Sequence, residues 1–283
     1  MKRKLFNSLP VIILALGLAF AGCDNGTTGN GGGGENDPIS VDLSLPPIKE
    51  VAAFSGTFVS SETDAKSLVT DAFTEISGIS PSPSVNNARS LSRSIARSVH
   101  TEPYEEIYDH DTTILTDAEV TGFIQGKATQ SVADDDRAGE TVGDYMEVSL
   151  KGKLAIVFTG ATKNGSTING KYGIDENMYY KLQVTSINPV KEALTISSNT
   201  SDGYAVSISK GGKGLKFVMR IENKINNKTI RDVASFDLDD LGTLFDTYRL
   251  TLDIYDNANV KQEQYSKTFT SYKDAAAYLG INN

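Results

Sequence analysis

The chain has 283 residues, of which 39% are hydrophobic and 22% are charged, a composition typical of folded proteins and not of disordered ones. Its formal net charge of −9 repels the phosphate backbone of nucleic acids, so we expect no nucleic-acid binding. The single cysteine excludes an intrachain disulfide.

The first 22 residues have the pattern of an export signal. Lys2, Arg3 and Lys4 precede the apolar run Leu9–Gly22, which has 14 residues. A permanent transmembrane helix needs about 20 apolar residues, so this run is too short. A positive start, a short apolar middle and small residues at the end indicate a removable signal peptide. Its removal would take away three cations and no acidic residue, and the net charge would fall from −9 to −12.

The run ends in FAGC, residues 20–23, which resembles the lipobox of bacterial lipoproteins. Ala21 and Gly22 match that pattern, whereas Phe20 stands where leucine is usual. The resemblance covers only residues 1–23. It implies cleavage between Gly22 and Cys23, a diacylglycerol on the Cys23 sulfur and acylation of the new amine. Several acyl chains anchor a protein stably to a membrane where one does not. The alternatives are an uncleaved anchor helix or a free structural cysteine. Because the apolar run is short and ends in this pattern, we expect a membrane-anchored lipoprotein of the bacterial cell envelope.

Residues 24–38, DNGTTGNGGGGENDP, are rich in glycine and contain no large apolar side chain. Such a segment cannot contribute to a core, so we expect a flexible tether with a mean span of roughly 20 Å. The chain is thus divided into a signal peptide (1–22), a lipidated cysteine with its tether (23–38) and a single β-rich domain (39–283).

An amphipathic helix is predicted over residues 61–77. Ser60 or Ser61 can cap its start, and Gly78 suits its end. Its apolar residues recur at helical spacing, which places them on one face. They are Ala65, Leu68, Val69, Ala72, Phe73 and Ile76.

A Ser/Arg-rich arm follows at residues 80–100. Arg89, Arg93 and Arg97 recur every four residues beside the apolar positions of a predicted helix over 85–99. The arginines form a possible basic surface for anionic lipid or an acidic partner. We favour a solvated arm, because each arginine contributes only about 1 kcal/mol at a charged membrane.

Residues 100–111 contain both histidines of the chain, His100 and His110, among acidic residues. A metal site is the functional alternative, but the spacing matches neither a zinc motif nor an EF-hand. We interpret this stretch as an acidic loop that leads to the first strand, and ADDDR (133–137) as a solvated turn. We expect no metal and no cofactor.

From about residue 118 onward the hydrophobic pattern alternates with period two, which predicts strands. Residues 145–158 read as one long strand or a closely coupled pair. Residues 167–187 read as two strands around a turn at 175–177, and 193–223 as three strands with turns at NTSDG (199–203) and KGGKG (210–214). Residues 248–269 read as a hairpin that turns at 256–259. A short helix over 271–280 follows, with Ser271 as its cap and Gly280 at its end.

These elements predict an α+β, β-rich fold, in which a curved antiparallel meander sheet or half-barrel carries the two helices in its concavity. The short connections leave no room for the crossover helices that a parallel sheet needs. Such a fold is similar to that of the periplasmic lipoprotein carriers and related lipid-binding envelope proteins. The similarity concerns the architecture alone, because no motif supports it residue by residue.

The sequence contains no Gly-x-Ser-x-Gly elbow and no Walker loop, and a lipidated Cys23 cannot act as a nucleophile. We therefore expect a non-enzymatic protein with a binding or structural role. The alternative is a carrier of an apolar ligand such as a lipid. A further alternative is a hydrolase with two carboxylates about 5–10 Å apart. The carrier would hold its ligand in a pocket lined by Phe158, Leu182, Phe217 and Met219.

Overall fold

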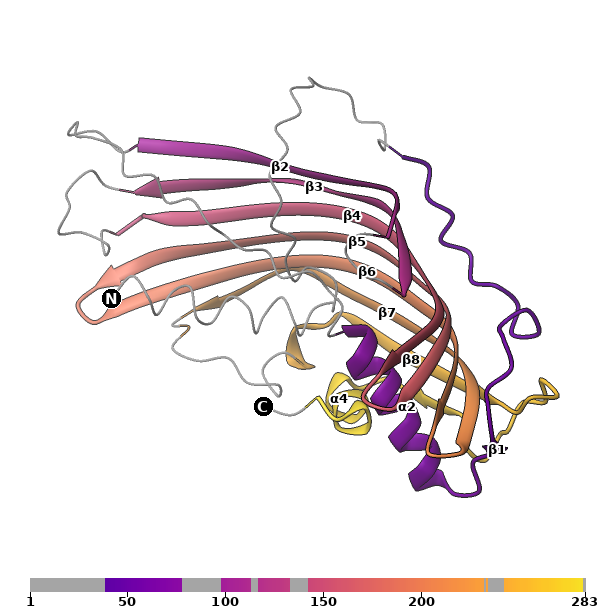
Figure 1. The fold of residues 1–283 in the computed structure, drawn as a ribbon. Helices are drawn as coiled ribbons and strands as arrows, with labels where there is room; N and C mark the ends of the chain where they lie inside the picture. The colour runs from indigo at the N-terminus through magenta and orange to yellow at the C-terminus, as the bar shows by residue number, and fades with distance from the viewer. Residues whose placement is uncertain are drawn as a thin grey trace.

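The computed structural model describes residues 39–77, 98–112, 117–132, 142–231, 233 and 242–281. The signal peptide, Cys23, the tether, the three arginines of the arm and ADDDR (133–137) lie outside these residues. The described chain forms one nine-stranded sheet (Figure 1). Eight of its strands follow one another as an antiparallel meander, and β1 (Thr57–Phe58) pairs in parallel with β7. The strands of this meander are β2 (Ser98–Asp111), β3 (Ala118–Val132), β4 (Tyr145–Lys163), β5 (Ser166–Ile187), β6 (Val190–Lys210), β7 (Lys213–Arg231), β8 (Thr247–Tyr255) and β9 (Lys267–Phe269).

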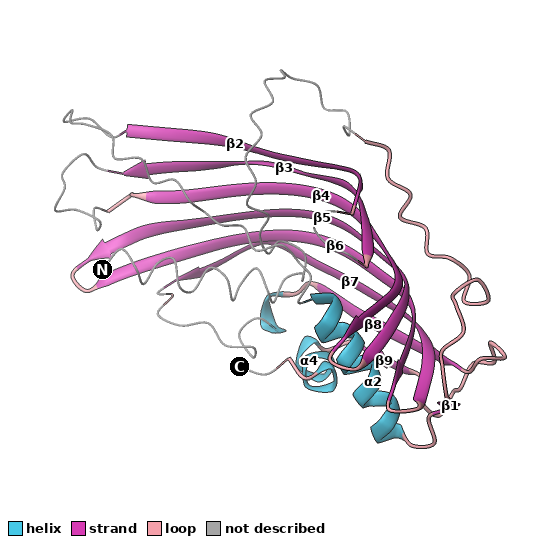
Figure 2. Ribbon diagram, in the orientation of Figure 1, coloured by secondary structure: helices cyan, strands magenta, loops and turns pink. Residues whose placement is uncertain are grey.

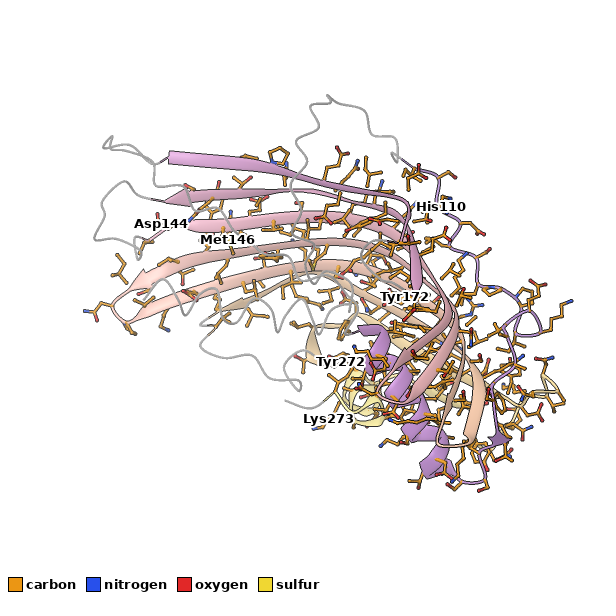
Figure 3. All side chains as sticks on the ribbon, in the orientation of Figure 1. His110, Asp144, Met146, Tyr172, Tyr272 and Lys273 are labelled. Atoms are coloured by element: carbon orange, nitrogen blue, oxygen red, sulfur yellow. The ribbon has the colours of Figure 1, made fainter. Side chains whose placement is uncertain are left out.

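The sheet is strongly curved, and both named helices lie in its concavity near one end (Figures 1 and 2). These are α2 (Glu62–Ser77) and α4 (Tyr272–Leu279). Figure 3 shows Tyr272 in the half with the helices and Met146 toward the other end of the strands. The path from β2 to β9 does not close into a barrel. The predicted fold class, a curved antiparallel meander with two helices packed on it, is confirmed.

Both helices begin where their capping residues predict, and α4 also ends at its predicted residue. The Ser61 hydroxyl accepts a hydrogen bond from the Asp64 amide at 3.1 Å, which caps α2. The Ser271 hydroxyl accepts from the Asp274 amide at 3.4 Å, and Gly280 ends α4 in the left-handed conformation at φ 73°. All six predicted apolar residues of α2 are buried. Its Phe73 ring lies 6.2 Å from the ring of Tyr204 on β6, so α2 packs on the sheet.

Two predicted turns are wrong, because β5 runs through residues 175–177 and β6 runs through 199–203 without interruption. Asp175 pairs with Ser201, and Asn177 pairs with Asn199. These residues favour turns when only their local sequence is considered. Here they are paired across two neighbouring strands, so their backbone groups are satisfied within the sheet. The turn predicted within 210–214 is confirmed, with Gly211 and Gly212 at positive φ between β6 and β7. Residues 145–158 belong to the single strand β4.

The predicted acidic loop at 100–111 is also wrong, because these residues form β2, paired with β3 along most of its length. Ser98 and Val99, the end of the helix predicted over 85–99, belong to the same strand. Within the described part of the chain β2 is an edge strand, where charged residues and Pro103 are tolerated on the unpaired side. At the other edge, the hairpin predicted to turn at 256–259 is confirmed, with β8 and β9 joined by a longer connection.

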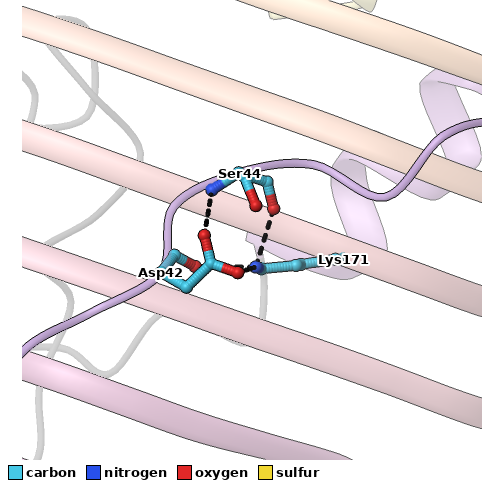
Figure 4. A network of polar contacts seen from close by, with 3 residues as sticks. All are labelled: Asp42, Ser44 and Lys171. Carbon is cyan, nitrogen blue, oxygen red and sulfur yellow. Dashed lines mark hydrogen bonds and ion pairs between the residues drawn. The ribbon is translucent and has the colours of Figure 1, made fainter.

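The segment 39–56, which we call the strap, crosses the convex face of the sheet before β1. The Lys171 amine donates to the backbone oxygens of Asp42 and Ser44 at 2.6 and 2.7 Å (Figure 4). Leu45 lies over Gly203, where an added Cβ would come within 2.8 Å of the leucine side chain. The strap therefore holds the N-terminal end of the described chain on the face opposite to the helices.

Candidate functional site

The concave face of β4–β7 is divided into three zones along the strands. The first zone is filled by the helices, whose apolar side chains pack with the sheet in one core cluster. Phe158, Phe217 and Met219 belong to this zone and are at most 2% exposed. Leu182 belongs to a second cluster. The structure thus brings three of the four predicted pocket residues together among helix side chains and places the fourth elsewhere.

The second zone is a row of polar side chains, which we call the polar belt: Glu176, Ser198, Thr200, Asp202 and Asn223. Glu176 on β5 pairs with Thr200 on β6, and Thr200 pairs with Asn223 on β7, so these three lie in one row across the sheet. Ser198 and Asp202 flank Thr200 on the same face of β6. All five belt residues are buried, with Glu176 only 1% exposed and Asp202 only 4% exposed. The polar belt therefore lies in the interior, where a charge is unfavourable.

The two carboxyl groups of the polar belt have no cationic partner among the residues that the structure describes. No ion pair among the described residues involves either of them. Glu176 Oε2 and Asp202 Oδ1 are buried and accept no hydrogen bond from the described part of the chain. Burial raises the pKa of Glu176 to about 7, against a smaller opposing effect of a hydrogen bond from Thr200. Burial, and then the charge of Glu176, raise the pKa of Asp202 well above its ordinary value. Both groups thus hold a proton more tightly than exposed carboxylates do.

Two stacked tyrosines adjoin the polar belt. The rings of Tyr172 and Tyr204, which pair across β5 and β6, lie 4.4 Å apart with an interplanar angle of 15°. The Tyr172 hydroxyl is buried, and the neighbour that affects its pKa through a side-chain hydrogen bond is Tyr204. Burial is the largest cause that raises the pKa of both phenols. The charge of Asp202 is the second cause for each phenol, because Asp202 lies beside the two rings. The tyrosines supply hydroxyl groups and an aromatic face at the edge of the polar belt.

The third zone is an apolar surface that continues along the strands beyond the polar belt, and we call it the distal face. Leu244, Tyr272 and Ala276 extend its cluster toward α4. No described helix lies against its outer part (Figure 1). Met146, Val148 and Leu150 of β4 border it and are only partly buried. The buried residues of the distal face are Met178, Tyr180, Leu182, Val184, Leu194, Ile196 and Ile225.

A cleft of about 360 Å³ adjoins the end of the polar belt, with Phe245, Tyr248 and Tyr272 among its lining residues. Their ring centroids lie 5.3 to 5.5 Å from one another. Tyr248 pairs with Asn223 across β7 and β8, so the cleft continues the row of the polar belt to the next strand. The Tyr272 hydroxyl is buried and has no hydrogen-bond partner within the described ranges.

A shallow groove of about 530 Å³ lies on the opposite face of the sheet. Lys181, Lys191 and Arg231 line it together with threonine, serine and glutamine side chains from β5–β7. The sequence analysis missed this basic surface because its cations come from three strands. The basic surface predicted from Arg89, Arg93 and Arg97 lies outside the described residues.

The polar belt was not predicted from the sequence either, although the period-two alternation of buried side chains runs through it. Ile174, Glu176 and Met178 continue the alternation of β5, and Thr200, Asp202 and Tyr204 continue that of β6. The aspartate, asparagine and glycine residues at these positions favour turns in local sequence, which conceals the alternation that runs through them.

Among the described residues, no group of three or more histidine, cysteine, aspartate or glutamate side chains is arranged to hold a metal ion. His110 is exposed and pairs with Glu119 on the surface. No helix in the described ranges is long and apolar enough to span a membrane. Comparisons with protein-family models, with curated proteins and with solved structures found no match.

Proposed function

We propose that this protein is a lipid-anchored component of the bacterial cell envelope that binds an apolar ligand against the concave face of its sheet and catalyses no reaction. The FAGC stretch at residues 20–23 supports the anchor. The observation that carries the binding role is the distal face, an apolar cluster on neighbouring strands past the helices, whose bordering residues Met146, Val148 and Leu150 are only partly buried.

The dimensions of the distal face suit a lipid chain. From Met178 to Val184 on β5 it spans roughly 20 Å at about 3.3 Å per residue. One leaflet of a bilayer has a hydrocarbon depth of about 15 Å, which an acyl chain fills. Each buried methylene contributes about 0.8 kcal/mol, so a chain laid along this surface would be held by apolar contact alone.

The anchor is tested by replacing Cys23 with alanine and comparing membrane and soluble fractions of the producing cells. We expect the variant to leave the membrane fraction and to lose labelling by radioactive palmitate. Full membrane retention of the variant would contradict lipid anchoring, whatever the domain binds.

Ligand binding is tested on the chain from residue 23 onward with Cys23→Ser. The described fold begins at residue 39, so this change leaves all described elements intact. We expect native mass spectrometry to find a bound lipid, and Met146→Asp to weaken that binding by placing a charge beside the distal face. Val157→Asp is the matched control, because Val157 is a 41% exposed residue of the same strand. If no lipid binds, or if both variants bind as well as the parent, this role is wrong.

The hydrolase alternative is less well supported. Glu176 and Asp202 are diagonal neighbours on adjacent strands, with Cα atoms expected about 7–8 Å apart. A hydrolytic pair needs one carboxylate that stays ionised beside one that holds a proton. Burial instead raises the pKa of both groups. We therefore favour binding over catalysis.

A further inference from the structure

The unpaired carboxyl groups of the polar belt differ from the other buried charges of this protein. The Glu75 carboxylate is 5% exposed but accepts from the Asn164 amide at 2.5 Å and pairs with the Lys163 amine at 3.1 Å. The buried Lys216 amine donates to the Val51 carbonyl oxygen at 2.7 Å. Where the fold buries a charge elsewhere, it also supplies a partner.

Two buried carboxyl oxygens of the polar belt, Glu176 Oε2 and Asp202 Oδ1, accept no hydrogen bond from the described residues, and the buried hydroxyl of Tyr172 lies beside them. They come from two adjacent strands and the same face of the sheet. Burying a polar group without a hydrogen bond is unfavourable by a few kcal/mol, and such groups are often found where a ligand completes the site. All three atoms can accept a hydrogen bond, so together they suit a group that only donates.

We propose that the polar belt binds the protonated amine headgroup of an amphiphile whose apolar tail lies along the distal face. This inference rests on the proposed function and adds the chemical class of the ligand. An ammonium group has three donors and no acceptor, which matches Glu176, Asp202 and Tyr172. The stacked rings of Tyr172 and Tyr204 can add a cation–π contact. An anionic headgroup would be repelled once Glu176 is ionised, which its pKa of about 7 allows at pH 8.

The head and tail of such a ligand would occupy neighbouring positions of the same strands. Met178 is the next residue after Glu176 on this face of β5, and Ile196 follows Ser198 on β6. A ligand held by the polar belt can therefore continue directly onto the distal face. A metal ion fits less well, because the described residues hold no cluster of three ligating side chains.

The proposal also predicts a pH dependence of binding. An ammonium ion is attracted by an ionised Glu176, whose pKa is raised to about 7. Aliphatic amines resemble lysine and stay protonated up to about pH 10. Amine binding should therefore tighten as the pH rises from 6 to 8. The charge of Glu176 acts on Asp202 and Tyr172, and the charge of Asp202 acts in turn on Tyr204 and Tyr248.

The test compares dodecylamine, dodecanol and dodecanoate, below their micelle concentrations, on the Cys23→Ser chain from residue 23 by calorimetry at pH 8. We expect the amine to bind at least tenfold more tightly than the alcohol, and the carboxylate to bind most weakly. Glu176→Gln and Asp202→Asn should each weaken amine binding about tenfold and leave alcohol binding unchanged. Asp175→Asn is the matched control, since Asp175 is the exposed neighbour of Glu176 and points to the other face.

The outcomes separate this proposal from the function on which it rests. If amine and alcohol bind equally, the headgroup assignment is overturned and apolar binding stands. If none of the three compounds binds, the proposed function fails and this inference fails with it. Circular dichroism of each variant shows whether it is folded. If one of the two carboxyl variants does not fold, the other still tests the headgroup assignment.

Discussion

Replacing Glu176 with glutamine should change how the stability of the protein depends on pH. The folded chain raises the pKa of this carboxyl group from 4.5 to about 7 because the side chain is buried. The folded state therefore binds the proton more tightly than the unfolded state does. The stabilisation is fully present below about pH 4.5 and is lost as the pH rises through 7. Glutamine has nearly the same shape and no proton to lose, so the variant lacks this contribution.

The size of the effect follows from the two pKa values. One pKa unit corresponds to about 1.4 kcal/mol, so the rise from 4.5 to about 7 corresponds to roughly 3 kcal/mol of unfolding free energy. Asp202 shifts in the same direction and adds to the loss in both proteins. The tyrosines around the polar belt stay protonated over this range, because their pKa values are raised above 10. The difference between parent and variant thus reports Glu176 together with the effect of its charge on Asp202.

The assay is urea unfolding of the Cys23→Ser chain from residue 23, followed by circular dichroism at pH 5, 6, 7 and 8. The parent should lose about 2.5 kcal/mol more stability than Glu176→Gln between pH 5 and 8, because the rest of the change falls below pH 5. Asp175→Asn should follow the parent, because Asp175 is exposed on the other face. Identical pH profiles for the parent and Glu176→Gln would refute the assignment of a buried, unpaired carboxyl group.

Three further substitutions test the strap and the helix cap. Gly203→Val should destabilise the protein by about 1–3 kcal/mol, because its side chain would meet Leu45 of the strap. Lys216→Met should destabilise it by about 1–3 kcal/mol, because the Val51 carbonyl of the strap loses its donor. Ser271→Ala should cost about 1 kcal/mol by removing the cap of α4. Urea unfolding measures all three, and limited proteolysis should cut the strap faster in the first two variants.

A negative result would have a different meaning for the strap substitutions than for the cap substitution. Unchanged stability and proteolysis in Gly203→Val and Lys216→Met would mean that the strap does not lie on the convex face as described. Unchanged stability in Ser271→Ala alone would concern only the cap. Thr268→Ala is a suitable control for the cap, because Thr268 is an exposed hydroxyl residue on β9 close in sequence to Ser271.

Local sequence determined the elements whose signals lie within a few residues. Ser61 and Ser271 cap their helices because each hydroxyl reaches an amide three residues ahead. The alternation of apolar residues predicted strands with one buried face, and the short connections predicted an antiparallel meander. The interpretation of residues 1–38 rests on sequence alone, because the chemistry of an export signal and a lipidated cysteine requires no fold.

Tertiary structure decided what local sequence left ambiguous. The stretches at 175–177 and 199–203 have turn composition, and they remain strands because each is the other's partner across β5 and β6. That pairing also creates the polar belt, since it places Glu176 beside Thr200 and Asp202 although they are far apart in the sequence. Likewise, β2 is a strand because β3 pairs with it. Strand register depends on which distant residues meet, so the candidate site became visible only once the sheet was assembled.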